Sequence, residues 1–184
     1  LLFTQYRVQE QAQEIDSARQ EARTDSLTGV ANRKAFEEKL HLSLGKYQRE
    51  EAPFVLVLVD LDHFKRINDS HGHQAGDRVL EMIGDAMREH VREGDFVARL
   101  GGDEFAILLP HTEMPVGHAV AARLHANICE GASFTSSQGN EVAVGLSIGV
   151  AAVRPEDNAE SILARADRAM YKSKNRGRNQ VHCE

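Results

Sequence analysis

The chain has 184 residues, enough for one domain with a sizeable core. Its 28 acidic and 22 basic side chains give a net charge of −6, which argues against a protein that grips duplex nucleic acid through a basic face. Its two cysteines match no disulfide framework or zinc spacing, and no segment is typical of a signal peptide or membrane span, so we expect a reducing compartment.

Residues 1–24 contain no glycine or proline and predict a helix. Leu1, Val8, Ile15 and Ala22 recur every seven residues, whereas the companion heptad positions are polar or small. This half-heptad pattern fits two interpretations equally: a helical stalk that dimerises poorly alone, or a solvated helix. The chain does not begin with methionine, so we expect it to continue upstream in a longer protein that carries a sensor.

A turn at residues 25–29 ends this helix, so we assign 1–24 to a stalk or linker and 25–184 to one domain. Asn32 is a suitable N-cap for the next helix. The apolar positions of that helix, spaced for one face, are Phe36, Leu40 and Leu44.

A continuous apolar run at residues 54–59 predicts a central strand that is covered on both faces. The run ends in Asp60, Leu61 and Asp62, so Asp60 is the first carboxylate at the edge of the core. Residues 76–91 then predict an amphipathic helix.

Two short apolar runs, 97–100 and 105–109, flank a Gly-Gly turn and predict a β-hairpin. Asp103 and Glu104 follow the glycines, and this acidic turn taken alone is most simply a solvated one. Asp60 changes that balance, because carboxylates at a strand end beside a hairpin are suited to Mg²⁺. Two such ions would clamp the attacking and leaving oxygens of a phosphoryl transfer.

The rest of the chain predicts a helix at 116–128, a hairpin at 133–153 and a last helix at 162–174. We expect the hairpin to turn at 138–140 and its second strand to cover 142–153. Mixed helices and hairpins indicate an α+β sandwich, with helices packed on an antiparallel sheet.

Several motifs, in order, resemble the GGDEF-domain family of diguanylate cyclases. They lie at residues 25–33, 60–69, 72–77, 101–105, 147–151 and 166–179. Ordered motifs at consistent spacing are far more specific than one pentapeptide. The resemblance implies a palm-like βαββαβ fold similar to that of adenylyl cyclases and polymerases. The chain resembles the family's C-terminal catalytic domain with part of a helical stalk.

The resemblance also implies a nucleotidyltransferase reaction in which two GTP condense to cyclic di-GMP with release of two pyrophosphates. Each domain would hold one GTP, whose 3′-hydroxyl attacks the α-phosphate held by a second copy, so the enzyme would be a homodimer of half-sites. Two Mg²⁺ ions per site, replaceable by Mn²⁺, would be the cofactor. The domain would be cytoplasmic, in a bacterial protein that can be membrane-anchored, with no nucleic-acid polymer as partner.

The metal ligands implied by the resemblance are Asp60, the Leu61 carbonyl, Asp103 and Glu104. Asp103 is also the candidate acceptor of the 3′-hydroxyl proton, although metal activation of the hydroxyl competes with that role. Lys65 would neutralise charge that develops on the phosphate, and without its neighbours it would be interpreted as an exposed lysine. The catalytic set is therefore Asp103, Glu104 and Lys65.

The substrate contacts implied by the resemblance are Phe64, Lys65, Asn68, His73, Asp77, Lys174 and Arg178. Asn68 and Asp77 would read guanine, since a carboxylate accepts from its N1–H and N2–H₂ groups, which adenine lacks. His73 would touch the base or ribose, or simply pack. Lys174 and Arg178 would contact the triphosphate, the alternative being a solvated basic terminus.

Arg92 and Asp95 fit the family's Arg-x-x-Asp site for inhibitory product, with Arg123 as a second contact. Arginine can stack on guanine and pair with phosphate. The alternative is a surface turn. For the whole domain, the alternative to an active cyclase is a non-catalytic receptor for GTP or cyclic di-GMP.

Overall fold

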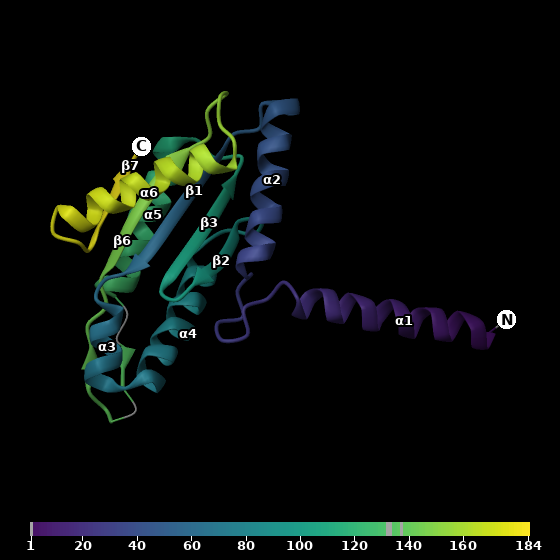
Figure 1. The fold of residues 1–184 in the computed structure, drawn as a ribbon, viewed down its shortest axis with the longest axis horizontal. Coiled ribbons are helices and arrows are strands. Elements are labelled where there is room, and N and C mark those ends of the chain that lie inside the picture. Colours follow the sequence, from purple (N-terminus) through teal and green to yellow (C-terminus); the bar gives the residue numbers. More distant parts are fainter. Residues whose placement is uncertain (1, 132–133, 137) are drawn as a thin grey trace.

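The structure is a computed structural model that describes residues 2–131, 134–136 and 138–184. Helix α1 (Leu2–Glu21) projects away from the remainder of the molecule (Figure 1). Its apolar side chains Val8 and Ile15 are exposed. The predicted helix is thus present, while the first heptad position, Leu1, lies outside the described residues. No described helix combines the length and apolar character needed to cross a membrane.

One five-stranded sheet organises the domain. Its strands are β1 (Phe54–Leu61), β2 (Phe96–Gly101), β3 (Glu104–Pro110), β6 (Leu146–Ala152) and β7 (Gln180–Cys183). They lie in the order β2-β3-β1-β6-β7, antiparallel except for the parallel pair β6 and β7. Every residue of β1 is buried, which confirms the predicted central strand and the antiparallel α+β fold.

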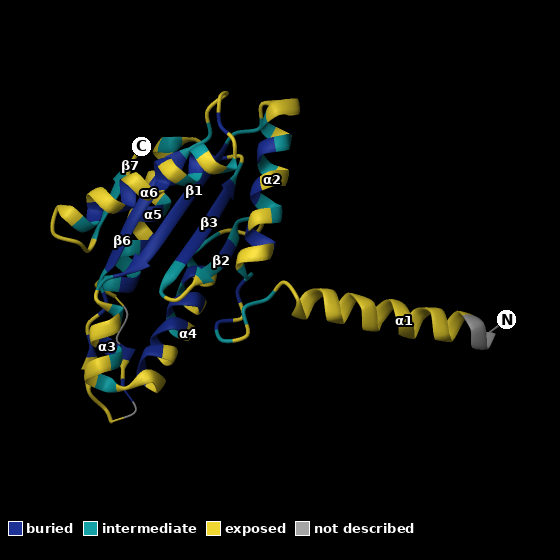
Figure 2. Ribbon diagram, viewed as in Figure 1, coloured by how far each residue is buried: buried dark blue, intermediate teal, exposed yellow. Residues whose placement is uncertain are grey.

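Helices cover both faces of this sheet. They are α2 (Arg33–Glu50), α3 (Phe64–His71), α4 (His73–His90), α5 (Met114–Cys129) and α6 (Ala159–Asn175). Alternate side chains of β1 point to opposite faces. Val57 and Val59 join a core with α4 and α5, whereas Leu56 and Leu58 join a core with α2 and α6. The buried sheet therefore lies between two helical layers (Figure 2).

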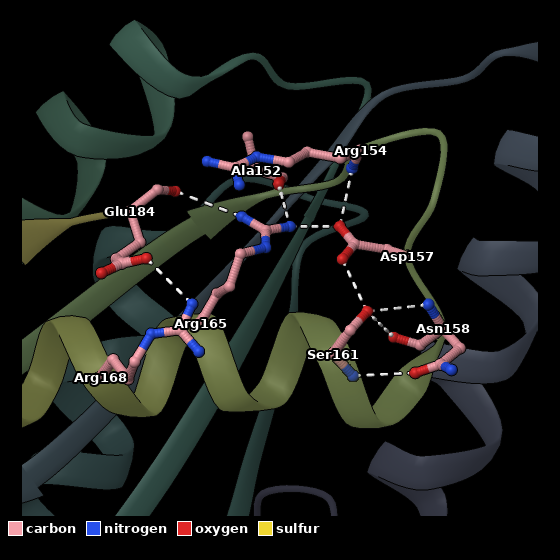
Figure 3. Close-up of polar contacts among 8 residues, drawn as sticks. All are labelled: Ala152, Arg154, Asp157, Asn158, Ser161, Arg165, Arg168 and Glu184. Carbon is pink, nitrogen blue, oxygen red and sulfur yellow. Dashed lines mark hydrogen bonds and ion pairs between the residues drawn. The ribbon is translucent and has the colours of Figure 1, made fainter.

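The N-terminal ends of α2 and α6 are fixed by side-chain caps. Asn32 accepts a hydrogen bond from the Ala35 amide at 3.0 Å, as predicted for α2. Asn158 and Ser161 form a reciprocal capping box at the start of α6 (Figure 3). Next to it, buried Arg165 pairs with Asp157 in the preceding loop and donates to the Ala152 carbonyl at 2.8 Å, which joins α6 to the end of β6.

Residues 133–153 do not form the single long hairpin predicted from the sequence. Strands β4 (Phe134–Thr135) and β5 (Glu141–Val142) form a separate short ribbon, and Ser133 lies outside the described residues. The chain then passes close to the end of β1, where the Asp62 amide donates to the Gly145 carbonyl at 2.8 Å. From Leu146 onward it pairs with β1, because burial between two strands stabilises this apolar segment more than an exposed ribbon would.

Candidate functional site

The sheet brings the predicted metal-binding carboxylates together. Asp60 near the end of β1 lies directly opposite Glu104 at the start of β3 in the antiparallel register. One residue on, the Leu61 amide donates to the Asp103 carbonyl at 3.2 Å. Side chains directly opposite each other in such a pair are about 5 Å apart at Cβ. The hairpin thus places its two acids against the acidic end of the central strand.

Lys174 in the last turn of α6 reaches this acidic cluster and forms an ion pair with Asp60. Burial, with Asp103 as a further cause, raises the pKa of Asp60 to about 6, against the opposing effect of Lys174. Burial and the neighbouring Asp60 also raise the pKa of Glu104. The cluster therefore holds more negative charge than its surroundings stabilise, which favours a bound cation.

The carboxylate donors fit a hard cation such as Mg²⁺. Asp60 is 8% exposed, and its Oδ1 atom is buried without a hydrogen-bond partner among the described residues. A buried oxygen with no partner is costly unless something binds it. Within the described ranges, however, no three His, Cys, Asp or Glu side chains converge as a complete metal-binding group. An ion here would take its remaining ligands from substrate phosphates and water.

The predicted guanine contacts lie on α3 and α4, which pack closely through Gly76. A Cβ atom at Gly76 would lie 1.8 Å from Asn68 Oδ1 and 3.1 Å from the Phe64 ring, so a larger residue would displace the Asn68 side chain. Asn68 Oδ1 is buried with no partner in the described chain, and Asp77 is exposed next to Gly76. His73 is exposed one helical turn before Asp77. Asn68 and Asp77 thus supply two acceptors from adjoining helices, the kind of group that pairs with guanine N–H donors.

The predicted phosphate contacts are divided between two places. Lys65 is exposed in the first turn of α3, where backbone N–H groups lack helical partners. Arg178 and residues of α3, such as Arg66, line a cavity of about 500 Å³, which Asp62 and His63 also line. Lys174 is instead engaged with Asp60. The structure therefore places one predicted phosphate contact at the acidic cluster and one at the cavity.

Arg99 is a residue that the sequence reasoning missed. Its guanidinium donates to the Gly102 carbonyl at 3.0 and 2.7 Å, and it also contacts both carboxylate oxygens of Asp25 at 3.3 Å. Burial alone would raise the pKa of Asp25, but hydrogen bonds from Thr28 and the charge of Arg99 hold it below its usual value. The Asp25 turn after α1 is thereby joined to the acidic hairpin. The signal available in the sequence was the first motif, which supplies both Asp25 and Thr28.

The Arg-x-x-Asp segment forms a turn in which Arg92 Nε contacts Asp95 Oδ1 at 3.2 Å. Asp95 also accepts from the Arg92 amide, and Arg92 donates to Thr112 Oγ1 at 2.8 Å. The turn lines a groove of about 370 Å³, together with Arg88. Arg123 donates to the His90 carbonyl at 3.1 Å, which places it beside the C-terminus of α4, two residues before Arg92. The three predicted product contacts thus lie in one region.

Comparison with known proteins gives the same family as the motifs. Residues 22–180 match the family model described as diguanylate cyclase, GGDEF domain. The chain is 39% identical over 167 residues to diguanylate cyclase DgcP of Pseudomonas aeruginosa, covering 91% of this chain and 25% of DgcP. It is 36% identical over 169 residues to response regulator PleD of Caulobacter vibrioides, covering 91% of this chain and 37% of PleD. The chain therefore corresponds to only part of these relatives.

Solved structures agree. The coiled coil and GGDEF domain of DgcB from Caulobacter crescentus, in complex with c-di-GMP, superimposes with a TM-score of 0.92 at 31% identity, covering 98% of this chain and 95% of that one. Diguanylate cyclase SiaD, in complex with its activator SiaC from P. aeruginosa, gives a TM-score of 0.87 at 31% identity, covering 98% and 69%. With a family model that matches most of its length, this chain belongs to the GGDEF-domain family of diguanylate cyclases.

Proposed function

We propose that this domain is an active diguanylate cyclase that condenses two GTP into cyclic di-GMP and two pyrophosphates. The observation that carries the proposal is the direct cross-strand pairing of Asp60 with Glu104, beside the contact between Leu61 and Asp103. Receptor domains need a nucleotide site but no cluster of acids at the reacting centre. Here all the acids are present, and one of them has a buried oxygen that no described group satisfies.

Asp60, Asp103, Glu104 and the Leu61 carbonyl would hold Mg²⁺. When bound, the metal would lower the pKa of the attacking hydroxyl and neutralise phosphate charge. Asp103 would accept the proton of the 3′-hydroxyl. The hydroxyl oxygen then forms a bond to the α-phosphorus, and the bond from that phosphorus to the pyrophosphate oxygen breaks. Lys65 would stabilise the charge that develops on the phosphates.

Base selection would come from Asn68 and Asp77 at the other end of the site. Asn68 Oδ1 is a buried acceptor, and Asp77 supplies carboxylate oxygens. Both would accept from guanine N–H groups, whereas adenine would leave them unpaired at a cost of about 1–3 kcal/mol each. His73, one turn from Asp77 on the same helix, would contact the base or ribose.

A second copy of the chain would complete the reaction, because one domain holds one nucleotide and the two reacting groups belong to different nucleotides. The exposed apolar positions of α1 offer the contact that would hold two copies together. The similar DgcB structure contains a coiled coil in the corresponding region, which supports the same arrangement here.

Incubation with GTP and Mg²⁺, followed by chromatography of the nucleotides, tests the proposal. We expect cyclic di-GMP and two pyrophosphates for each molecule of product. A chelator should abolish the reaction. The rate of product formation should rise more steeply than in proportion to protein concentration. Glu104→Gln removes a metal ligand while keeping its shape, and Glu81→Gln on α4 is the matched control. GTP binding without product, at concentrations where dimers form, would favour the receptor alternative.

We further propose that product binds at Arg92, Asp95 and Arg123 and inhibits turnover. Arg92 and Asp95 line one groove, and Arg123 contacts the His90 carbonyl nearby; this arrangement and the c-di-GMP in the similar DgcB structure support the proposal. Arg92→Ala should raise the product concentration needed for half-inhibition by about tenfold or more, because it removes a charge-assisted contact. Arg49→Ala, at an exposed arginine of α2 outside this groove, is the control. Unchanged inhibition in the Arg92 variant would mean that this segment is only a surface turn.

A further inference from the structure

Asp62, the second acid of the motif at the end of β1, has no part in the mechanism above. Its Oδ1 atom accepts a hydrogen bond from Ser147 Oγ at 2.6 Å, and its Oδ2 atom accepts from the Asn179 amide at 2.8 Å. Ser147 is fully buried in β6, and Asn179 lies in the loop between α6 and β7. The carboxylate of Asp62 therefore joins three segments that are distant in sequence, and both of its oxygens are engaged.

Asn179 extends this connection. Its side-chain Oδ1 accepts from His125 Nε2 at 2.9 Å and from the Leu146 amide at 3.4 Å. The residue thus contacts α5 and the start of β6 through its side chain, while its backbone contacts Asp62. A loop held at three points on two strands and a helix cannot shift without breaking several hydrogen bonds.

The same loop between α6 and β7 carries Arg178. Arg178 and Asn179 both adopt a left-handed backbone conformation, with φ angles of 64° and 48°. Such a conformation costs a residue other than glycine about 1–2 kcal/mol. The Arg178 amide donates to the Ser173 carbonyl at 2.9 Å, and its carbonyl accepts from Gln180 at 3.1 Å. Contacts before, at and after Arg178 together maintain this unfavourable geometry.

Arg178 and Asp62 both line the cavity of about 500 Å³ beside α3. Asp62 is two residues after Asp60, the first acid of the acidic cluster. Because Asp62 binds the Asn179 amide, it connects the loop that carries Arg178 to the end of β1. A nucleotide held at the acidic cluster would extend its terminal phosphates toward the cations around this cavity. The hydrogen bonds of Asp62 and Asn179 connect the loop that carries Arg178 to the end of the strand that carries Asp60.

We propose that Asp62 and Asn179 are positioning residues that hold Arg178 at a fixed place relative to the acidic cluster, so that the site favours triphosphates. The inference rests on the proposed function, since it assumes that guanine nucleotides occupy the site. It assigns Asp62 a role distinct from that of Asp60, although both acids belong to one motif.

The test is equilibrium binding of two ligands in the presence of Mg²⁺. One is a GTP analogue with a methylene between the α- and β-phosphorus, which cannot be condensed, and the other is GMP. The variants are Asp62→Asn, Asn179→Gly and Arg178→Ala. Asn179→Gly keeps the left-handed conformation accessible and removes only the side-chain acceptor. Asp16→Asn on α1 is the charge-matched control.

We expect Asp62→Asn and Asn179→Gly each to weaken binding of the analogue by about fivefold, while GMP binding stays within twofold. In a chain that already carries Arg178→Ala, neither change should weaken the analogue further, because the group that they position is gone. The Mg²⁺ concentration for half-maximal binding should not move with Asp62→Asn, whereas it should rise with Asp60→Asn. A general loss of structure would affect both ligands equally.

Equal weakening of GMP, additive effects in the Arg178→Ala chain, or an increased Mg²⁺ requirement in Asp62→Asn would each overturn the inference. If the unaltered chain prefers the triphosphate and the variants retain that preference, the inference fails and the proposed function stands. If the unaltered chain binds neither ligand, the proposed function fails and the inference fails with it. Thermal unfolding of each variant establishes that the compared proteins are folded.

Discussion

At the scale of single residues, the acids at the end of β1 and in the adjacent hairpin differ sharply in environment. Asp60 is buried, carries a raised pKa and has one oxygen without a hydrogen-bond partner among the described residues. Asp62, two residues later, has both oxygens hydrogen-bonded to protein groups. A carboxylate that the protein leaves unsatisfied is available to a ligand, whereas a satisfied one serves the structure.

Asp103→Asn should lower turnover by at least about a hundredfold, because the amide is a poorer metal ligand and cannot accept the hydroxyl proton. Its fold should survive, since Asp103 is only half-buried in the hairpin turn. Initial rates with GTP and Mg²⁺, together with circular dichroism, measure both effects. Retained activity would remove Asp103 from the reacting centre.

Asp77→Ala should reduce the preference for GTP over ATP by about tenfold or more, because guanine would lose its carboxylate acceptor. The ratio of kcat/KM for the two nucleotides is the quantity to measure. Arg78→Ala, the next exposed residue of α4, serves as the control. A preference that does not change would eliminate Asp77 as a base contact.

At the scale of elements, α6 illustrates how a helix is anchored so that its far end serves the site. The Asp157–Arg165 pair and the capping box hold its start in place (Figure 3). Lys174 in its last turn reaches Asp60. Burial alone would raise the pKa of Asp157, but hydrogen bonds from Ser161, Arg165 and the Arg154 amide hold it below the usual value.

A carboxylate with a lowered pKa stabilises the fold above its unfolded-state pKa of about 3.9 and loses that contribution as pH falls through the folded value. Asp157→Asn should therefore lower the free energy of unfolding by about 3 kcal/mol near pH 7, since it leaves Arg165 buried without its counter-charge. The difference from the unaltered protein should shrink below about pH 4. Urea unfolding across this range measures it, with exposed Glu156→Gln as control. A difference independent of pH would contradict the ionic role of Asp157.

At the scale of the whole molecule, α1 extends from the domain with its apolar side chains exposed (Figure 1). The hydrogen-bonded link from Asp25 through Arg99 to Gly102 joins the turn after α1 to the acidic hairpin. A contact between two copies along α1 would thus act close to the reacting centre.

Deletion of residues 1–21 should lower specific activity at low protein concentration and leave nucleotide affinity unchanged, because each domain keeps its own half-site. Activity should recover as concentration rises, since mass action replaces the lost contact. Rates and sedimentation across a concentration series measure this. Identical concentration dependence with and without α1 would mean that the helix does not promote dimerisation.

The sequence by itself determined the helices, the central strand, the acidic hairpin and the family, because periodicity, caps and motifs are local properties of the chain. It left the partition of residues 133–153 wrong and did not predict β7 (Gln180–Cys183). The division of residues 133–153 and the formation of β7 both depend on which strand of the sheet is available for pairing. No local sequence pattern carries that information.

Only the tertiary structure decided which motif residues meet. The antiparallel register places Asp60 against Glu104, and the packing of α6 directs Lys174 to Asp60. The Asn179 amide binds Asp62, which gives this carboxylate a different environment from that of Asp60. Adjacent acids in one motif have the same sequence signature. Their roles diverge because hydrogen-bond partners come from distant segments: Ser147 and Asn179 are 85 and 117 residues from Asp62.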